Sequence, residues 1–144
     1  MEQRQTALGT ARLIATLIYV GPLVIFPWVT RMAKIPTPPS AKVMGVLVPA
    51  LLFVAVTDYV ISLFIEARLL RQARGLRAPQ SLVSAAVVTA SFGASLAVYG
   101  LIVTMLGAPV WGAVFYVLCA AHGLHLMMRW PAYQQVVEDT GSNS

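Results

Sequence analysis

Residues 78–128 read APQSLVSAAVVTASFGASLAVYGLIVTMLGAPVWGAVFYVLCAAHGLHLMM and contain no Lys, Arg, Asp or Glu. A helix needs about 20 apolar residues to cross the hydrocarbon core of a bilayer. This stretch of 51 residues is therefore too long for one crossing. Gly107, Ala108 and Pro109 provide a natural break, because Gly and Pro interrupt helices. The stretch predicts two membrane-spanning helices, 80–106 and 109–129.

Two further apolar segments precede this stretch. Arg12 and Arg31 enclose 18 uncharged residues, and Lys42 and Glu66 enclose 23 residues that carry a single charge. Both segments are long enough to cross a bilayer as helices. The sequence thus predicts two more spans, 12–30 and 43–66.

The composition agrees with a membrane protein. The chain is 58% hydrophobic and 10% charged, whereas soluble domains carry about 25% charged residues. Long, continuously apolar segments favour helices over barrel strands, which are about 10 residues long and alternate in polarity. We therefore expect an all-α membrane protein, with residues 1–144 forming one four-transmembrane-helix bundle and a disordered polar tail over 138–144.

The positive charges predict an orientation in the membrane. With four spans, both termini and the second loop lie on one side, and that side carries seven basic residues: Arg4, Arg12, Arg68, Arg71, Arg74, Arg77 and Arg129. The other side carries Arg31, Lys34 and Lys42. Because the side richer in Lys and Arg faces the cytoplasm, we expect both termini to be cytoplasmic, in a bacterial cytoplasmic membrane. The arginines from 68 to 77 are expected to contact anionic lipid headgroups.

Small residues recur along the third span at a spacing of 4, 3, 4 and 3, which places them on one face of a helix. They are Ala86, Ala90, Gly93, Ala97 and Gly100. Small side chains let two membrane helices approach closely. This small-residue stripe predicts a packing face, directed either at a neighbouring span or at a second copy of the protein. A homo-oligomer or a larger membrane complex is therefore an expected partner.

Part of the same span resembles a known family. Residues 94–103 read ASLAVYGLIV, and they are similar to the ion-carrying helix of rotary ATPase proteolipids, the c subunits, whose pattern is close to Glu-Ala-Leu-Ala-Ile-Tyr-Gly-Leu-Val-Val. The match in residue type runs from Leu96 to Leu101. Upstream, Arg77-Ala78-Pro79 is similar to the Arg-Gln-Pro of the proteolipid loop. The resemblance covers about 30 residues and implies a proteolipid-like hairpin of spans two and three.

The chain departs from that family at the residue that carries the ion. Ala94 stands where proteolipids place their ion-binding carboxylate. The distance from Pro79 to Ala94 is also shorter than the spacing between loop and carboxylate in the family. The resemblance therefore implies a relative that lacks the rotor ion site.

Ionisable residues within membrane spans are rare and often functional. Asp58 lies 8 residues before Glu66, and His122 lies 7 residues before Arg129. At 1.5 Å per residue, both would lie about 10–12 Å below the cytoplasmic surface. A polar layer is therefore expected at this depth, made of Tyr19, Asp58, Thr89, Ser91, His122 and His125.

Two interpretations of this layer remain open. Hydroxyl groups could hold Asp58 and so specify packing, or Asp58 and His122 could form a pair that binds or passes protons. His122 and His125 lie three residues apart on one helix face, where they cannot ligate one haem from opposite sides. A metal would need a third ligand, for which Asp58 is the only candidate. We expect no metal and no cofactor.

Two functions follow as hypotheses. The first is a non-catalytic structural or accessory subunit of a membrane assembly, proteolipid-like but without a rotor ion site. The second is a small proton- or ion-linked transporter that uses Asp58 and His122. An enzyme is not expected, because the sequence has no glycine-rich phosphate loop or catalytic motif and its loops are short. Nucleic-acid binding is not expected either, since the net charge of +5 is explained by membrane orientation.

Overall fold

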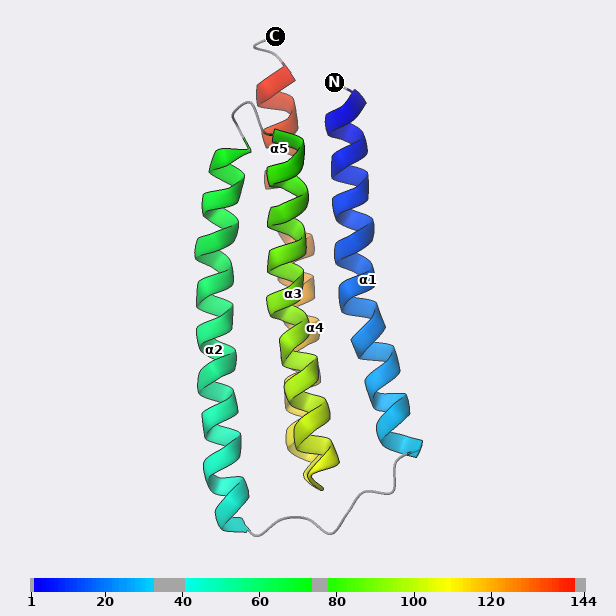
Figure 1. Cartoon of the computed structure of the whole chain (residues 1–144), viewed down its shortest axis with the longest axis vertical. Helices are drawn as coiled ribbons and strands as arrows, with labels where there is room; N and C mark the ends of the chain where they lie inside the picture. The colour runs from blue at the N-terminus through cyan, green and yellow to red at the C-terminus, as the bar shows by residue number, and fades with distance from the viewer. Residues whose placement is uncertain (1, 33–40, 74–77, 142–144) are drawn as a thin grey trace.

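The computed structural model describes residues 2–32, 41–73 and 78–141 (Figure 1). Nearly all of these residues are helical. The elements are α1 (Glu2–Met32), α2 (Ala41–Gln72), α3 (Ala78–Met105), α4 (Pro109–Met128) and α5 (Trp130–Gly141). The proline-rich first loop and the positions of Arg74 and Arg77 lie outside the described residues.

Four helical segments are long and apolar enough to cross a membrane. They are Gln5–Met32, Lys42–Gln72, Gln80–Met105 and Pro109–Val136. Large apolar side chains such as Phe53, Phe64 and Val110 are exposed on the outside of the bundle. They suit a lipid environment, in which apolar surface need not be buried. The chain is an integral membrane protein with an all-α, four-helix fold, which confirms the prediction.

Helix α3 is at the centre of the arrangement. It packs against α1, α2 and α4. Figure 1 shows α1, α3 and α2 side by side, with α4 behind α3. The start of α1, the end of α2 and the whole of α5 lie at one end of the bundle, which we call the terminal end. Helix α3 is therefore the main packing partner of each of the other three spans.

The small-residue stripe of α3 faces the inside of this bundle. Ala86, Ala90 and Ala97 are fully buried, and Gly93 and Gly100 are buried as well. They pack against other helices of the same chain. The stripe was predicted to pack against either a neighbouring span or a second copy of the protein, and the structure supports the neighbouring span.

Two glycines bring α3 and α4 into close backbone contact. A Cβ atom added to Gly100 would lie 2.9 Å from the carbonyl oxygen of Gly112, and one added to Gly112 would lie 2.8 Å from that of Gly100. Real Cβ atoms do not approach so closely. The crossing of α3 and α4 therefore depends on the absence of side chains at both positions.

The ends of α4 differ in how well they were predicted. The break before it is confirmed: Gly107 adopts a positive φ of 87°, and Pro109 is the first residue of α4. After α4, only Arg129 separates it from α5. Helix α5 continues to Gly141, so residues 138–141 of the expected disordered tail are helical instead. The buried side chains of Tyr133 and Val136 hold α5 against the bundle, which adds apolar packing that the polar composition of the tail did not indicate.

Candidate functional site

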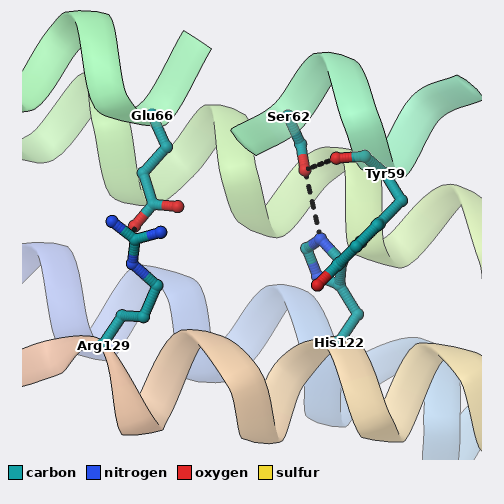
Figure 2. Close-up of polar contacts among 5 residues, drawn as sticks. All are labelled: Tyr59, Ser62, Glu66, His122 and Arg129. Atoms are coloured by element: carbon teal, nitrogen blue, oxygen red, sulfur yellow. Dashed lines mark hydrogen bonds and ion pairs between the residues drawn. The ribbon is translucent and has the colours of Figure 1, made fainter. Parts of the chain in front are cut away.

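A buried hydrogen-bonded group joins three helices near the middle of the bundle. Ser62 of α2 donates a hydrogen bond to the carbonyl oxygen of Tyr59 at 2.8 Å, and its Oγ lies 3.3 Å from Nε2 of His122 on α4 (Figure 2). On the other side of the imidazole, Nδ1 is hydrogen-bonded to the hydroxyl of Tyr19 on α1. We call Tyr19, Ser62 and His122 the histidine cluster.

The partners of His122 constrain where its hydrogens lie. The Ser62 hydroxyl donates to the Tyr59 carbonyl, so it accepts from Nε2, which then carries a hydrogen. The Tyr19 hydroxyl can either donate to Nδ1 or accept from it. Both ring nitrogens therefore have partners.

The sequence makes room for this cluster at a glycine. A Cβ atom at Gly93 of α3 would collide with the Tyr19 hydroxyl and with Nδ1 of His122. Tyr59 adds an aromatic wall, because its ring meets that of His122 edge-on with centroids 5.2 Å apart. The hydrogen bond between α1 and α4 thus passes directly over the backbone of α3.

A second buried polar group lies closer to the terminal end. The Glu66 side chain is 0% exposed, and its Oε1 lies 3.6 Å from Nε of Arg129, which is 38% exposed (Figure 2). Thr89 of α3 and Tyr133 of α5 are also buried and lie beside this pair. We call Glu66, Thr89, Arg129 and Tyr133 the glutamate cluster. It draws one residue each from α2, α3 and α5, and Arg129 from the junction of α4 and α5.

The oxygens of the glutamate cluster are short of hydrogen bonds. Among the described residues, both carboxylate oxygens of Glu66 and the hydroxyls of Thr89 and Tyr133 are buried without a hydrogen bond of good geometry, although the Tyr133 hydroxyl lies close to both Glu66 and Thr89. Buried polar atoms are normally satisfied, by protein or by an ordered water. The four oxygens of the cluster can therefore still accept hydrogen bonds from a water molecule, and the Glu66 carboxylate can take up a proton.

Asp58 belongs to a third and separate group. Its Oδ2 accepts hydrogen bonds from the hydroxyl of Tyr99 at 2.7 Å and from that of Ser95 at 3.1 Å, both on α3. His122 uses Tyr19 and Ser62 instead. The structure therefore does not bring Asp58 and His122 together as a bonded pair, and the hydroxyl-held carboxylate is the arrangement it supports.

The other three residues of the expected polar layer lie in three different surroundings. Thr89 joins the glutamate cluster. Ser91 is exposed, and its hydroxyl donates to the carbonyl of Val87 in its own helix. His125 meets the ring of Tyr59 at a centroid distance of 6.0 Å, while its Nε2 is buried without a hydrogen-bond partner. The six residues that were expected at one depth therefore do not form one site.

The arginines expected at lipid headgroups are described in part. Arg68 and Arg71 are exposed on the last turns of α2, and Nε of Arg71 donates to the carbonyl of Ala67 at 3.2 Å. Among the described residues, no three His, Cys, Asp or Glu side chains come together as a metal site would require.

Sequence reasoning missed most of the bonded partners, namely Ser62, Glu66, Ser95, Tyr99, Arg129 and Tyr133. A signal was present for two of them. Ser62 and Glu66 follow Asp58 at intervals of four residues, which places all three near one side of α2. Glu66 had been interpreted only as the marker of a helix end, and Arg129 as such a marker and as one of the basic residues that set the orientation.

No family model matches the chain, and neither a curated protein nor a solved structure matches it. The resemblance of residues 94–103 to rotary ATPase proteolipids stays a prediction.

Proposed function

We propose that the protein is a small proton-linked transporter and that Glu66 is the group that takes up and releases the proton. The observation that carries this proposal is a fully buried carboxylate inside a membrane-spanning bundle, beside the Tyr133 hydroxyl and 3.6 Å from Nε of Arg129, with no hydrogen bond of good geometry among the described residues. Ionisable groups inside membrane spans are costly, and they often mark proton pathways.

The surroundings of Glu66 favour exchange of a proton. An ionised buried carboxylate needs hydrogen bonds as well as an opposite charge. Arg129 supplies the opposite charge, but at 3.6 Å its Nε is beyond the 2.7–2.9 Å usual for a charge-assisted hydrogen bond. Because Arg129 is partly exposed, it also connects the cluster to the outside. Glu66 is thus placed to bind a proton without losing a firm hydrogen bond.

Proton-carrying groups continue from Glu66 toward the middle of the bundle. Ser62 lies one helical turn from Glu66 on α2, about 6 Å along the axis. It is bonded to His122, which is bonded to Tyr19. Hydroxyl and imidazole groups can each accept and donate a hydrogen. The two clusters together form half of a path, reaching from the terminal end to the centre.

Proton flux into liposomes tests this proposal. Purified protein is reconstituted with a pH-sensitive dye inside, and flux is driven by a potassium diffusion potential. Wild-type protein is expected to acidify or alkalinise the lumen faster than protein-free liposomes do. Glu66→Gln removes the titratable group but keeps the side-chain size, so it is expected to abolish the difference.

Glu138→Gln is the matched control, because Glu138 is exposed on α5. It makes the same chemical change outside the glutamate cluster and is expected to leave flux unaltered. Equal flux for wild type and Glu66→Gln, with both folded by circular dichroism, would remove the proposal.

A non-catalytic accessory subunit is the competing proposal. The contacts of Asp58 favour it, since a carboxylate held by Tyr99 and Ser95 is a packing contact between α2 and α3. The small-residue stripe no longer supports an oligomer, because it is occupied within the chain. Absence of flux together with a stable multimer in mild detergent would favour the accessory role.

The proposed orientation places both termini in the cytoplasm of a bacterial cell. The excess of arginine at the terminal end supports this. The glutamate cluster would then open toward the cytoplasm. Labelling of a single cysteine introduced at Ser142 by a membrane-impermeant reagent, in intact and in opened cells, tests the orientation.

A further inference from the structure

An apolar groove lies between α2 and α4, whose backbones both pack on α3 rather than on one another. It has a volume of about 250 Å³. Leu96 of α3 forms part of its lining, and the walls come from two turns of α2 and two turns of α4. Val56 and Leu118 on these walls are 62% and 38% exposed. The groove therefore opens sideways, onto the surface that faces lipid.

The two ends of the lateral groove differ in polarity. Leu52 and Leu118 lie toward the middle of the helices, whereas Tyr59 and His125 lie seven residues further toward the terminal end on the same helices. Seven residues of helix span about 10.5 Å. The groove thus runs parallel to the helices, with an aliphatic inner end and an aromatic end nearer the membrane surface.

One polar atom at the aromatic end has no partner. Nε2 of His125 is buried and makes no hydrogen bond within the described part of the chain. Three rings surround this end, because Tyr59 meets both His122 and His125 edge-on. Both nitrogens of His122 already have partners in the histidine cluster. His125 is therefore the lining residue with a ring nitrogen that makes no hydrogen bond, and rotation of its partly exposed ring would bring this nitrogen to the groove.

We propose that this lateral groove binds an uncharged membrane lipophile that ends in a flat carbonyl-bearing ring, of which an isoprenoid quinone is the type. The carbonyl oxygen accepts a hydrogen bond from Nε2 of His125, the ring lies against Tyr59, and the tail follows the aliphatic end. Its orientation matches that of a molecule dissolved in one leaflet of the bilayer.

The lining argues against the other lipids of a membrane. A phospholipid headgroup carries a phosphate and requires basic or strongly polar partners, and the lining contains no Lys or Arg. A pure hydrocarbon chain would leave Nε2 of His125 buried and unsatisfied, which is costly. A single hydrogen-bond acceptor on an apolar molecule meets both conditions.

The two histidines of the chain allow a direct test. Protein labelled with ¹⁵N at histidine gives two sets of ring resonances, which His125→Phe assigns. On titration with decylubiquinone in detergent micelles, the ring signal of His125 is expected to shift in a saturable way. Decylbenzene, which has the same tail but no carbonyl, is expected to bind roughly tenfold more weakly, as loss of one hydrogen bond predicts.

Two alanines provide matched variants. Ala121 lines the groove, whereas its neighbour Ala120 is exposed outside the lining. Ala121→Phe fills the groove and is expected to abolish the shift, while Ala120→Phe is expected to retain it. An unmoved His125 signal, equal binding by the two variants, or equal affinity for decylbenzene would each overturn the proposal. Because the readout is binding, it is independent of proton flux through Glu66.

Discussion

The hydroxyl of Tyr19 on α1 is hydrogen-bonded to Nδ1 of His122 on α4. These residues are 103 positions apart in the chain. Their contact passes over Gly93 of α3, where a methyl group would collide with both. Helices α1, α3 and α4 therefore meet at this point, where the hydrogen bond links α1 to α4 and the glycine lets α3 approach both.

Gly93→Ala is expected to destabilise the protein by about 1–3 kcal/mol, the usual cost of overpacking a core. The added methyl would displace the Tyr19 hydroxyl or the His122 ring. Gly21→Ala is the control, because a Cβ atom there meets nothing within 4 Å. Thermal unfolding in mild detergent should separate the two variants. Equal melting temperatures would contradict the close crossing described for α3.

Tyr19→Phe is expected to cost about 1–3 kcal/mol, because it leaves Nδ1 of His122 buried and unpaired. Tyr116→Phe makes the same change at a buried hydroxyl that lies near Thr104 but makes no hydrogen bond of good geometry within the described residues, and we expect a smaller loss there. Unfolding by SDS titration measures both free energies. A larger loss for Tyr116→Phe than for Tyr19→Phe would show that the histidine cluster contributes little.

Arg129→Leu is expected to lower stability by about 1–3 kcal/mol, because it leaves the buried Glu66 carboxylate without its opposite charge, while solvent screens the 38% exposed arginine. The double variant Glu66→Leu/Arg129→Leu should recover most of that loss, since an ion pair with a buried member can often be replaced by apolar groups at little cost. A double-mutant cycle of unfolding free energies gives the coupling. Additive losses would mean that the two side chains do not interact.

Asp58→Asn is expected to preserve both folding and proton flux. The amide oxygen of Asn can still accept from Tyr99 and Ser95, and Asp58 is not bonded to the histidine cluster. The liposome assay compares it with Glu66→Gln. If Asp58→Asn abolished flux while Glu66→Gln did not, the proton-binding role would belong to Asp58, as the sequence-based hypothesis had it.

The bundle itself could be predicted from the sequence because its cause is simple. Long uncharged segments must cross the bilayer as helices, and Gly107 and Pro109 can only end one helix and begin another. The small-residue stripe was also visible, since helical spacing alone places its members on one face. The absence of charge, the length of a segment and the helical spacing of its small residues are enough to predict such features.

The pairing of polar side chains could not be predicted in the same way. Counting residues gives the depth of Asp58 and His122 but not the rotation of their helices, and rotation assigns them to different partners. Glu66 had been placed at a helix end. Tyr133 of α5 packs beside it, and Tyr133 lies between the predicted end of the fourth span at 129 and the predicted tail at 138, where no element had been assigned. The partners of Asp58 and His122 and the burial of Glu66 are both set by contacts between segments that are distant in the sequence.

The central position of α3 also bears on the order in which the protein can be assembled. Helices α1 and α2 leave the ribosome first, yet each finds its main packing partner in α3 rather than in the other. The first half of the chain therefore enters the membrane as two separate helices with little tertiary structure. Folding waits for the synthesis of α3, and a chain that stopped at Gln72 would be an open substrate for membrane proteases.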